Sequence, residues 1–169
     1  MVFHEELEAD AFNLLGHLRA MAGNLRKLTP EHWDWTYAPP APTPRVIAIH
    51  TLAWLQCDRQ HILNPDVTTH SPVPEPPTEP EEICRALERE ADEWEHLLKR
   101  LTPNDLEGDR KQFGFGPINV RGFVTHMVQN VIYKHGQFAT LYFALGYDGD
   151  APYEAPFPNP IYKEALGIG

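Results

Sequence analysis

The sequence predicts an all-α protein: a four-helix bundle of two αα-hairpins, with long proline-rich loops and an irregular C-terminal tail. Two observations support this fold class. Apolar residues recur at steps of three and four in four long segments, which is typical of amphipathic helices. Leu-Thr-Pro occurs at residues 28–30 and 101–103, each time between one helical segment and a second that carries histidine. This repeat indicates paired hairpins, although Leu-Thr-Pro is also a common helix stop.

The first hairpin is predicted from residues 4–27 and 44–63. The apolar stripe of its first segment consists of Leu7, Ala11, Leu14, Leu15, Leu18, Met21, Ala22 and Leu25. Thr29 and Pro30 end this segment and start a short turn, since threonine is a favoured helix cap and proline a favoured first residue. Four prolines within six residues then make residues 33–45 a packed connection.

The second hairpin is predicted from residues 79–101 and 119–145. Six prolines make residues 64–80, which precede it, a loop. Four further prolines lie in residues 148–169, which follow it. We therefore predict one domain, the bundle of residues 1–147, and a proline-rich tail that packs on it.

Composition and charge exclude several classes of protein. The chain has 169 residues and a net charge of −10, and its Lys and Arg residues are scattered. Neither nucleic acid nor an anionic membrane surface is therefore an expected partner. No apolar run approaches the roughly 20 residues of a membrane span, and the N-terminus lacks the layout of a signal peptide. Two cysteines, Cys57 and Cys84, are too few for a disulfide scaffold, so we predict a cytoplasmic protein with free thiols.

His50 is the first candidate site residue. At about 100° per residue, the residues that share its face of the second helical segment are Val46, Ile47, Ala53, Trp54 and Cys57. We therefore predict that His50 lies in the middle of the apolar stripe. A buried imidazole needs a partner for each ring nitrogen, so His50 is either a hydrogen-bonded core residue or part of a functional site.

The last helical segment carries a ladder of polar residues. His126, Asn130 and Lys134 follow one another at steps of four, which places them along one edge of the buried sector. Lys134 falls inside the apolar sector, where a lysine either extends its amine to solvent or needs a partner for a buried charge. His135 points about 100° away from Lys134, toward the other flank.

Five segments together resemble one known family over about residues 5–147. They are Leu28-Thr29-Pro30-Glu31-His32-Trp33-Asp34-Trp35, Ile47-Ala48-Ile49-His50-Thr51-Leu52-Ala53-Trp54, Val120-Arg121-Gly122-Phe123-Val124-Thr125-His126, His135-Gly136-Gln137 and Leu145-Gly146. They are similar to DinB/YfiT-like proteins. The resemblance implies a four-helix bundle, often dimeric, that holds one divalent metal, commonly nickel or zinc, through three histidines. Some relatives are S-transferases or isomerases that use mycothiol, bacillithiol or glutathione. The family name records damage induction and does not imply DNA binding.

The resemblance can be carried over residue by residue. His50 matches the metal ligand from the second helix. The two ligands from the last helix precede a Gly-Gln pair, and here they fall on Asn130 and Lys134, neither of which is histidine. His126 matches a frequent histidine one turn earlier, and His135 takes a place usually held by arginine. Zinc and nickel prefer imidazole or thiolate, and an ammonium must first lose its proton, so tight metal binding is not expected.

We interpret this departure as a degenerate metal centre. In this hypothesis Lys134 places its positive charge where relatives keep a metal. His50 and Asn130 would accept its hydrogen bonds, and Asp58 or a glutamate would neutralise it, as a buried charge requires.

Three functions remain open at this point. The first is a small-molecule pocket around His50, of unassigned substrate, with His50 and Lys134 as candidate catalytic residues. The second is a divalent-metal-dependent thiol S-transferase or hydrolase that uses His50 and His126, with Asp58 as a further ligand. The third is a non-catalytic dimeric bundle. The sequence assigns no cofactor firmly, nickel or zinc is the metal to test, and a homodimer is the expected assembly.

Overall fold

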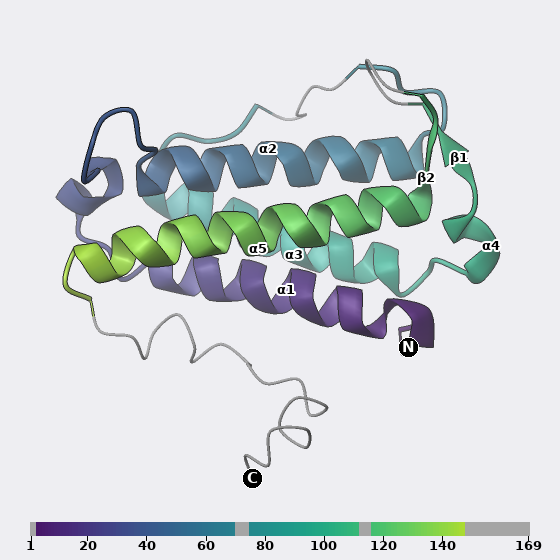
Figure 1. The fold of residues 1–169 in the computed structure, drawn as a ribbon, viewed down its shortest axis with the longest axis horizontal. Coiled ribbons are helices and arrows are strands. Elements are labelled where there is room, and N and C mark those ends of the chain that lie inside the picture. The colour runs from purple at the N-terminus through teal and green to yellow at the C-terminus, as the bar shows by residue number, and fades with distance from the viewer. Residues whose placement is uncertain (1–2, 70–74, 112–115, 148–169) are drawn as a thin grey trace, which may run out of the picture.

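The computed structural model describes residues 3–69, 75–111 and 116–147. Four long helices pack side by side in this part of the chain (Figure 1). They are α1 (Glu5–Leu25), α2 (Pro44–Leu63), α3 (Pro80–Leu98) and α5 (Val120–Ala144). The all-α prediction is thereby confirmed, and each helix begins and ends within about three residues of its predicted bounds.

The starts of α2 and α5 follow local sequence signals. Thr43 caps α2 by accepting a backbone hydrogen bond from its first turn, and Pro44 occupies the first helical position. Asn119 caps α5 by accepting a hydrogen bond from the N–H of Gly122. A Cβ on Gly122 would lie 2.5 Å from Cγ2 of Ile118, so this first turn has no room for a side chain there.

Three of the short elements lie between α3 and α5 and were not predicted. They are α4 (Pro103–Leu106), β1 (Asp109–Arg110) and β2 (Ile118–Asn119), and the two strands pair antiparallel. Each is too short to show a periodic pattern in the sequence. A further short element, the 3₁₀ helix η1 (Pro30–Asp34), occupies the turn predicted after the first helix.

Helices α1 and α2 lie at opposite corners of the bundle, since each packs against both α3 and α5 (Figure 1). The two helices of the first predicted hairpin are therefore diagonal and not adjacent. Residues 26–43, which include η1, make a connection long enough to cross the end of the bundle. This arrangement places α2 beside α5, and the two helices run antiparallel.

The bundle has a dense apolar core. Its largest fully buried side chains include Trp94, Tyr142, Phe123 and Phe138. The indole N–H of Trp94 donates to the backbone carbonyl of Leu55 at 3.2 Å, so the polar atom of this core residue is satisfied.

Two sequence expectations can be compared with this core and its surroundings. Cys57 and Cys84 are both buried and free, as predicted. None of the helices in the described ranges combines the length and apolar character of a membrane span. The predicted packing of the tail, residues 148–169, lies outside the described residues.

Candidate functional site in the α2–α5 seam

The polar residues singled out by the sequence gather where α2 and α5 meet. We call this region the α2–α5 seam and define it by six side chains: His50, Trp54, Asp58, His126, Asn130 and Lys134. Because the helices are antiparallel, the start of α2 lies near the end of α5. Asp58 meets His126 at one end of the seam, and His50 lies within the electrostatic influence of Lys134 at the other.

The predicted position of His50 in the middle of the apolar stripe is wrong, because this side chain is exposed. The buried side of α2 is formed instead by a stripe that includes Ile47, Thr51, Leu55, Asp58 and Ile62. His50 lies about 140° around the helix from Leu55. Apolar residues occur all around α2, and Val46 beside His50 is 53% exposed, so hydrophobicity alone misplaced the centre of the stripe.

His50 is held by its neighbour one turn along α2. Its Nε2 accepts a hydrogen bond from the indole N–H of Trp54 at 2.9 Å. Partial burial, and then the positive charge of Lys134, lower the pKa of His50. The imidazole is therefore neutral near pH 7, and because an indole can only donate, the proton of the ring sits on Nδ1.

His126 and Asp58 form the second pair in the seam. Nδ1 of His126 lies 2.6 Å from Oδ2 of Asp58, whose side chain is fully buried. The hydrogen bond to this carboxylate raises the pKa of His126, in opposition to its partial burial. The sequence had named both residues as alternative metal ligands, and the structure brings them together as a hydrogen-bonded pair.

Trp54 contacts both histidines of the seam. Its ring lies 6.0 Å from the ring of His50 and 5.2 Å from that of His126, edge to face in both cases. The two imidazoles therefore share an indole neighbour. The part played by Trp54 was missed at the level of the sequence, where it was counted only as bulk.

Lys134 is half-buried at the edge of the seam. Its amine donates to Oε1 of Gln137 at 3.2 Å and lies 5.2 Å from the centre of the Tyr133 ring. Burial lowers the pKa of this lysine. In the described part of the chain neither His50 nor Asn130 accepts a hydrogen bond from it, which differs from the hypothesis drawn from the sequence.

The charge of Lys134 is not neutralised as proposed either. Asp58 pairs with His126, and the described residues offer the lysine amine no carboxylate. Asn130 is half-buried, and its Oδ1 is enclosed without a hydrogen-bond partner among the described residues. This end of the seam therefore contains a cation with one side-chain hydrogen bond and an amide oxygen with none among the described residues.

A small hollow opens at Gln137, one turn of α5 beyond Lys134, and neither Lys134 nor His50 is among its lining residues. It has a volume of about 120 Å³, and Gln137, which accepts the hydrogen bond from Lys134, is one of its lining residues. The lining side chains are Tyr37, Pro42, Ile47, Gln137, Thr140 and Leu141. The hollow is mostly apolar, and it is connected to the amine of Lys134 through the hydrogen bond to Gln137.

The residues at the family's metal position do not fit nickel or zinc. No three His, Cys, Asp or Glu side chains of the described ranges come together as a metal-holding group. In the alternative set of His50, His126 and Asp58, the last two form the hydrogen-bonded pair. An ammonium and an amide supply neither imidazole nor thiolate, so no step through a metal is derived for this seam.

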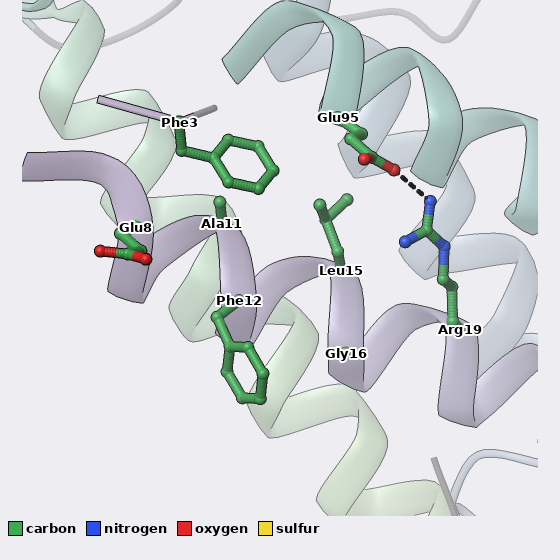
Figure 2. A pocket seen from close by; sticks show the side chains of 8 residues that line it. All are labelled: Phe3, Glu8, Ala11, Phe12, Leu15, Gly16, Arg19 and Glu95. Atoms are coloured by element: carbon green, nitrogen blue, oxygen red, sulfur yellow. Dashed lines mark hydrogen bonds and ion pairs between the residues drawn. The ribbon is translucent and has the colours of Figure 1, made fainter. Parts of the chain in front are cut away.

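A second, larger hollow lies along α1 and faces α3 (Figure 2). Its volume is about 240 Å³, and apolar side chains dominate its walls. Figure 2 shows Arg19 and Glu95 at one end, where they form an ion pair of 2.5 Å. The charges here neutralise each other, which distinguishes this hollow from the one beside Lys134.

Together these observations define the class of protein: an α-helical bundle with an imidazole- and amine-bearing seam between its second and last long helices. A family model described as the DinB superfamily matches residues 13–138. The chain therefore belongs to the DinB superfamily, as the resemblance in the sequence predicted. Comparisons with curated proteins and with solved structures found no match.

Proposed function

We propose that this member of the DinB superfamily binds a small molecule at the α2–α5 seam, around His50, and that its metal centre is degenerate. Lys134 supplies a positive charge at the position where the family resemblance implies a metal. The observation that carries the proposal is the half-buried amine of Lys134, which has no carboxylate partner in the described ranges and lies one hydrogen bond from a hollow.

The free-energy cost of partly desolvating the Lys134 ammonium supports a ligand-binding role for this side chain. A partly desolvated ammonium loses hydration that an ion pair would normally replace. Long cationic side chains elsewhere in the bundle recover this cost, as Arg59 does with Glu90 and Arg121 does with Glu6. Lys134 lacks such compensation, which an incoming ligand would provide.

The seam also has the groups needed for proton transfer. His50 is a neutral imidazole with its Nδ1–H unused by Trp54, and Lys134 is an amine whose pKa burial lowers. Any chemistry on a bound molecule would use these two groups as acid or base. The proposal itself concerns binding, and catalysis is a separate question for the same site.

Metal titration tests the degenerate centre. Isothermal titration calorimetry with zinc and nickel, after chelator treatment, should show no stoichiometric binding to the wild-type chain. The double variant Asn130→His with Lys134→His should bind either metal, because two imidazoles spaced i, i+4 would join His50. Lys134→Met is the control and should remain folded without gaining a metal. Stoichiometric uptake by the wild type, or none by the double variant, would overturn the degenerate centre.

A fragment titration tests the pocket. Small neutral and charged fragments added to ¹⁵N-labelled protein should shift the amide signals of His50, Lys134 and Gln137. Shifts confined to the α1 hollow of Figure 2 would place the binding site elsewhere and contradict the proposal.

A further inference from the structure

We propose that the ligand of the α2–α5 seam is a compact carboxylic acid, whose carboxylate binds the amine of Lys134 and whose apolar body fills the adjoining hollow. This inference rests on the proposed function and names its ligand class. The juxtaposition that carries it is a cation, for which the described residues offer no carboxylate, one hydrogen bond away from an apolar hollow.

The first step concerns the hydrogen-bonding capacity of Lys134. An ammonium group has three N–H donors, and one of them is used by Gln137. The ring of Tyr133 stabilises the positive charge from one side. Two donors therefore remain for a ligand, and a carboxylate, with two acceptor oxygens, is the group that satisfies both donors and charge.

The second step concerns what is special about this cation. Cationic side chains that reach between helices find carboxylates at short range, and Arg19 with Glu95 is an example. Lys99 and Lys111 also contact carboxylates, although locally: Lys99 contacts Glu95 one turn earlier in the chain, and the exposed Lys111 contacts Asp66. Lys134 is different although the chain carries a net charge of −10 and has carboxylates in excess. An external anion is therefore the partner that its position favours.

The third step concerns the body of the ligand. The hollow beside Gln137 measures about 120 Å³ and has walls from Ile47, Leu141 and Pro42. A cavity of about 150 Å³ is large enough to hold benzene in a protein interior. The hollow is somewhat smaller than that cavity but is open to solvent on one side, so we expect it to take no more than one aromatic ring or a short branched chain. The hydroxyl of Thr140, which lines the hollow, already donates to the carbonyl of Gly136. The part of the ligand inside the hollow therefore needs few polar groups besides its carboxylate.

The larger hollow along α1 does not carry the same inference. Its only cation among the lining residues, Arg19, is engaged by Glu95, and Glu8 adds a further negative charge to its rim (Figure 2). An anionic ligand would meet net negative charge there. The seam is therefore the better place for a carboxylate, although its hollow is smaller.

The test compares a carboxylate with its uncharged analogue. Benzoate and benzamide have nearly the same shape, and their dissociation constants can be measured by chemical-shift titration of ¹⁵N-labelled full-length protein. We expect benzoate to bind at least tenfold more tightly, and to shift the amide signals of Lys134 and Gln137. Lys134→Met should lose this preference, whereas Lys134→Arg, which keeps the charge, should retain most of it.

A matched control removes one positive charge elsewhere. Lys99 directly follows α3 as its C-cap and forms an ion pair with Glu95, so Lys99→Met changes the net charge equally and should leave benzoate binding unchanged. Equal affinities for benzoate and benzamide, or benzoate binding that survives Lys134→Met, would overturn the inference. If the inference is overturned in this way but uncharged fragments still bind at the seam, the proposed function stands. If no fragment binds at the seam, both the inference and the proposed function are wrong.

Discussion

The polar side chains on the two sides of α5, one facing α2 and the other facing α1, differ in their burial and in their charge. Lys134 lies in the α2–α5 seam, while the next residue, His135, is buried between α5 and α1 with 7% of its surface exposed. There Nδ1 of His135 lies 2.8 Å from Nδ1 of His17. The sequence placed His135 on the other flank from Lys134, and the contact with His17 agrees with that placement, but the pairing itself was not foreseen.

Burial sets the direction of the pKa shift in one histidine pair, and a carboxylate partner sets it in the other. Burial, and then the charge of His17, lower the pKa of His135 to about 4, so this imidazole pair is neutral at physiological pH. In the α2–α5 seam the carboxylate of Asp58 has the reverse effect and raises the pKa of His126. The comparison shows that the α1–α5 seam keeps its histidines uncharged, whereas the α2–α5 seam holds charge, as a ligand site requires.

The largest expected effect comes from breaking the charged pair. His126→Ala leaves the fully buried carboxylate of Asp58 without its imidazole, and we expect the free energy of unfolding to fall by about 3 kcal/mol. The matched change in the other seam, His17→Ala, removes a hydrogen bond between neutral rings and should cost about 1 to 2 kcal/mol. Urea denaturation at pH 6, where the raised pKa keeps His126 protonated, measures both. Equal losses would contradict the contrast between the seams.

We expect the neutral pair of His17 and His135 to make the protein less stable at acidic pH. His135 has a pKa of about 6.5 when unfolded and about 4 when folded. Between these values the unfolded chain binds a proton that the folded chain does not, so stability falls as the pH falls. The loss attributable to His135 is about 3 kcal/mol, at about 1.4 kcal/mol per pKa unit. Urea denaturation from pH 7 to 4 measures it, and His135→Gln should flatten the curve.

The charged pair supplies the control for that curve, because its sign is opposite. The folded state raises the pKa of His126, so its contribution is complete below the unfolded value and is lost as the pH rises through the folded value. His126→Gln should therefore remove a loss of stability on the alkaline side. A flattened acid limb in this variant, in place of His135→Gln, would reverse the assignment.

Removing the lysine charge should have a small effect on folding. Lys134→Met deletes a half-buried cation that has no carboxylate partner in the described ranges, so the free energy of unfolding should change by about 0.5 kcal/mol or less. Thermal and urea denaturation measure it. A loss comparable with that of His126→Ala would show that Lys134 is a structural residue and weaken its role in binding.

The smallest effect is a change in titration. The charge of Lys134 contributes to the lowered pKa of His50, so the pKa of His50 should rise in Lys134→Met. A pH series of imidazole ¹H–¹⁵N spectra measures this directly. An unchanged pKa would mean that burial alone controls His50 and that the two side chains do not share one site.

The fold was predictable from local signals in the sequence. The periods of three and four and the proline breaks predicted four helices to within about three residues at each end. What failed was the orientation of α2, where His50 was placed inward. Apolar residues occur all around α2, and Val46 remains exposed. A projection of the sequence at about 100° per residue therefore shows no clear boundary between the buried and the exposed side of this helix.

The candidate site was predictable only in part. The family resemblance identified positions 50, 130 and 134, and the absence of histidine at two of them is visible in the sequence itself. Asp58 and His126 were named together as alternative metal ligands, but neither their direct hydrogen bond nor the one from Lys134 to Gln137 was predicted. Which side chains meet between two helices depends on the rotation and the axial register of those helices. No local sequence pattern encodes the rotation or the register.

The sequence by itself determined the helices, their connections, the membership in the DinB superfamily and the absence of histidine at positions 130 and 134. Only the tertiary structure decided that α1 and α2 are diagonal and that α5 separates a neutral seam from a charged one. It also decided that Lys134 bonds to Gln137 at a hollow and finds no carboxylate among the described residues. The reason is the separation along the chain of the residues that interact. Helix formation depends on residues within one or two turns, whereas charge, burial and the space beside a side chain depend on which helices meet.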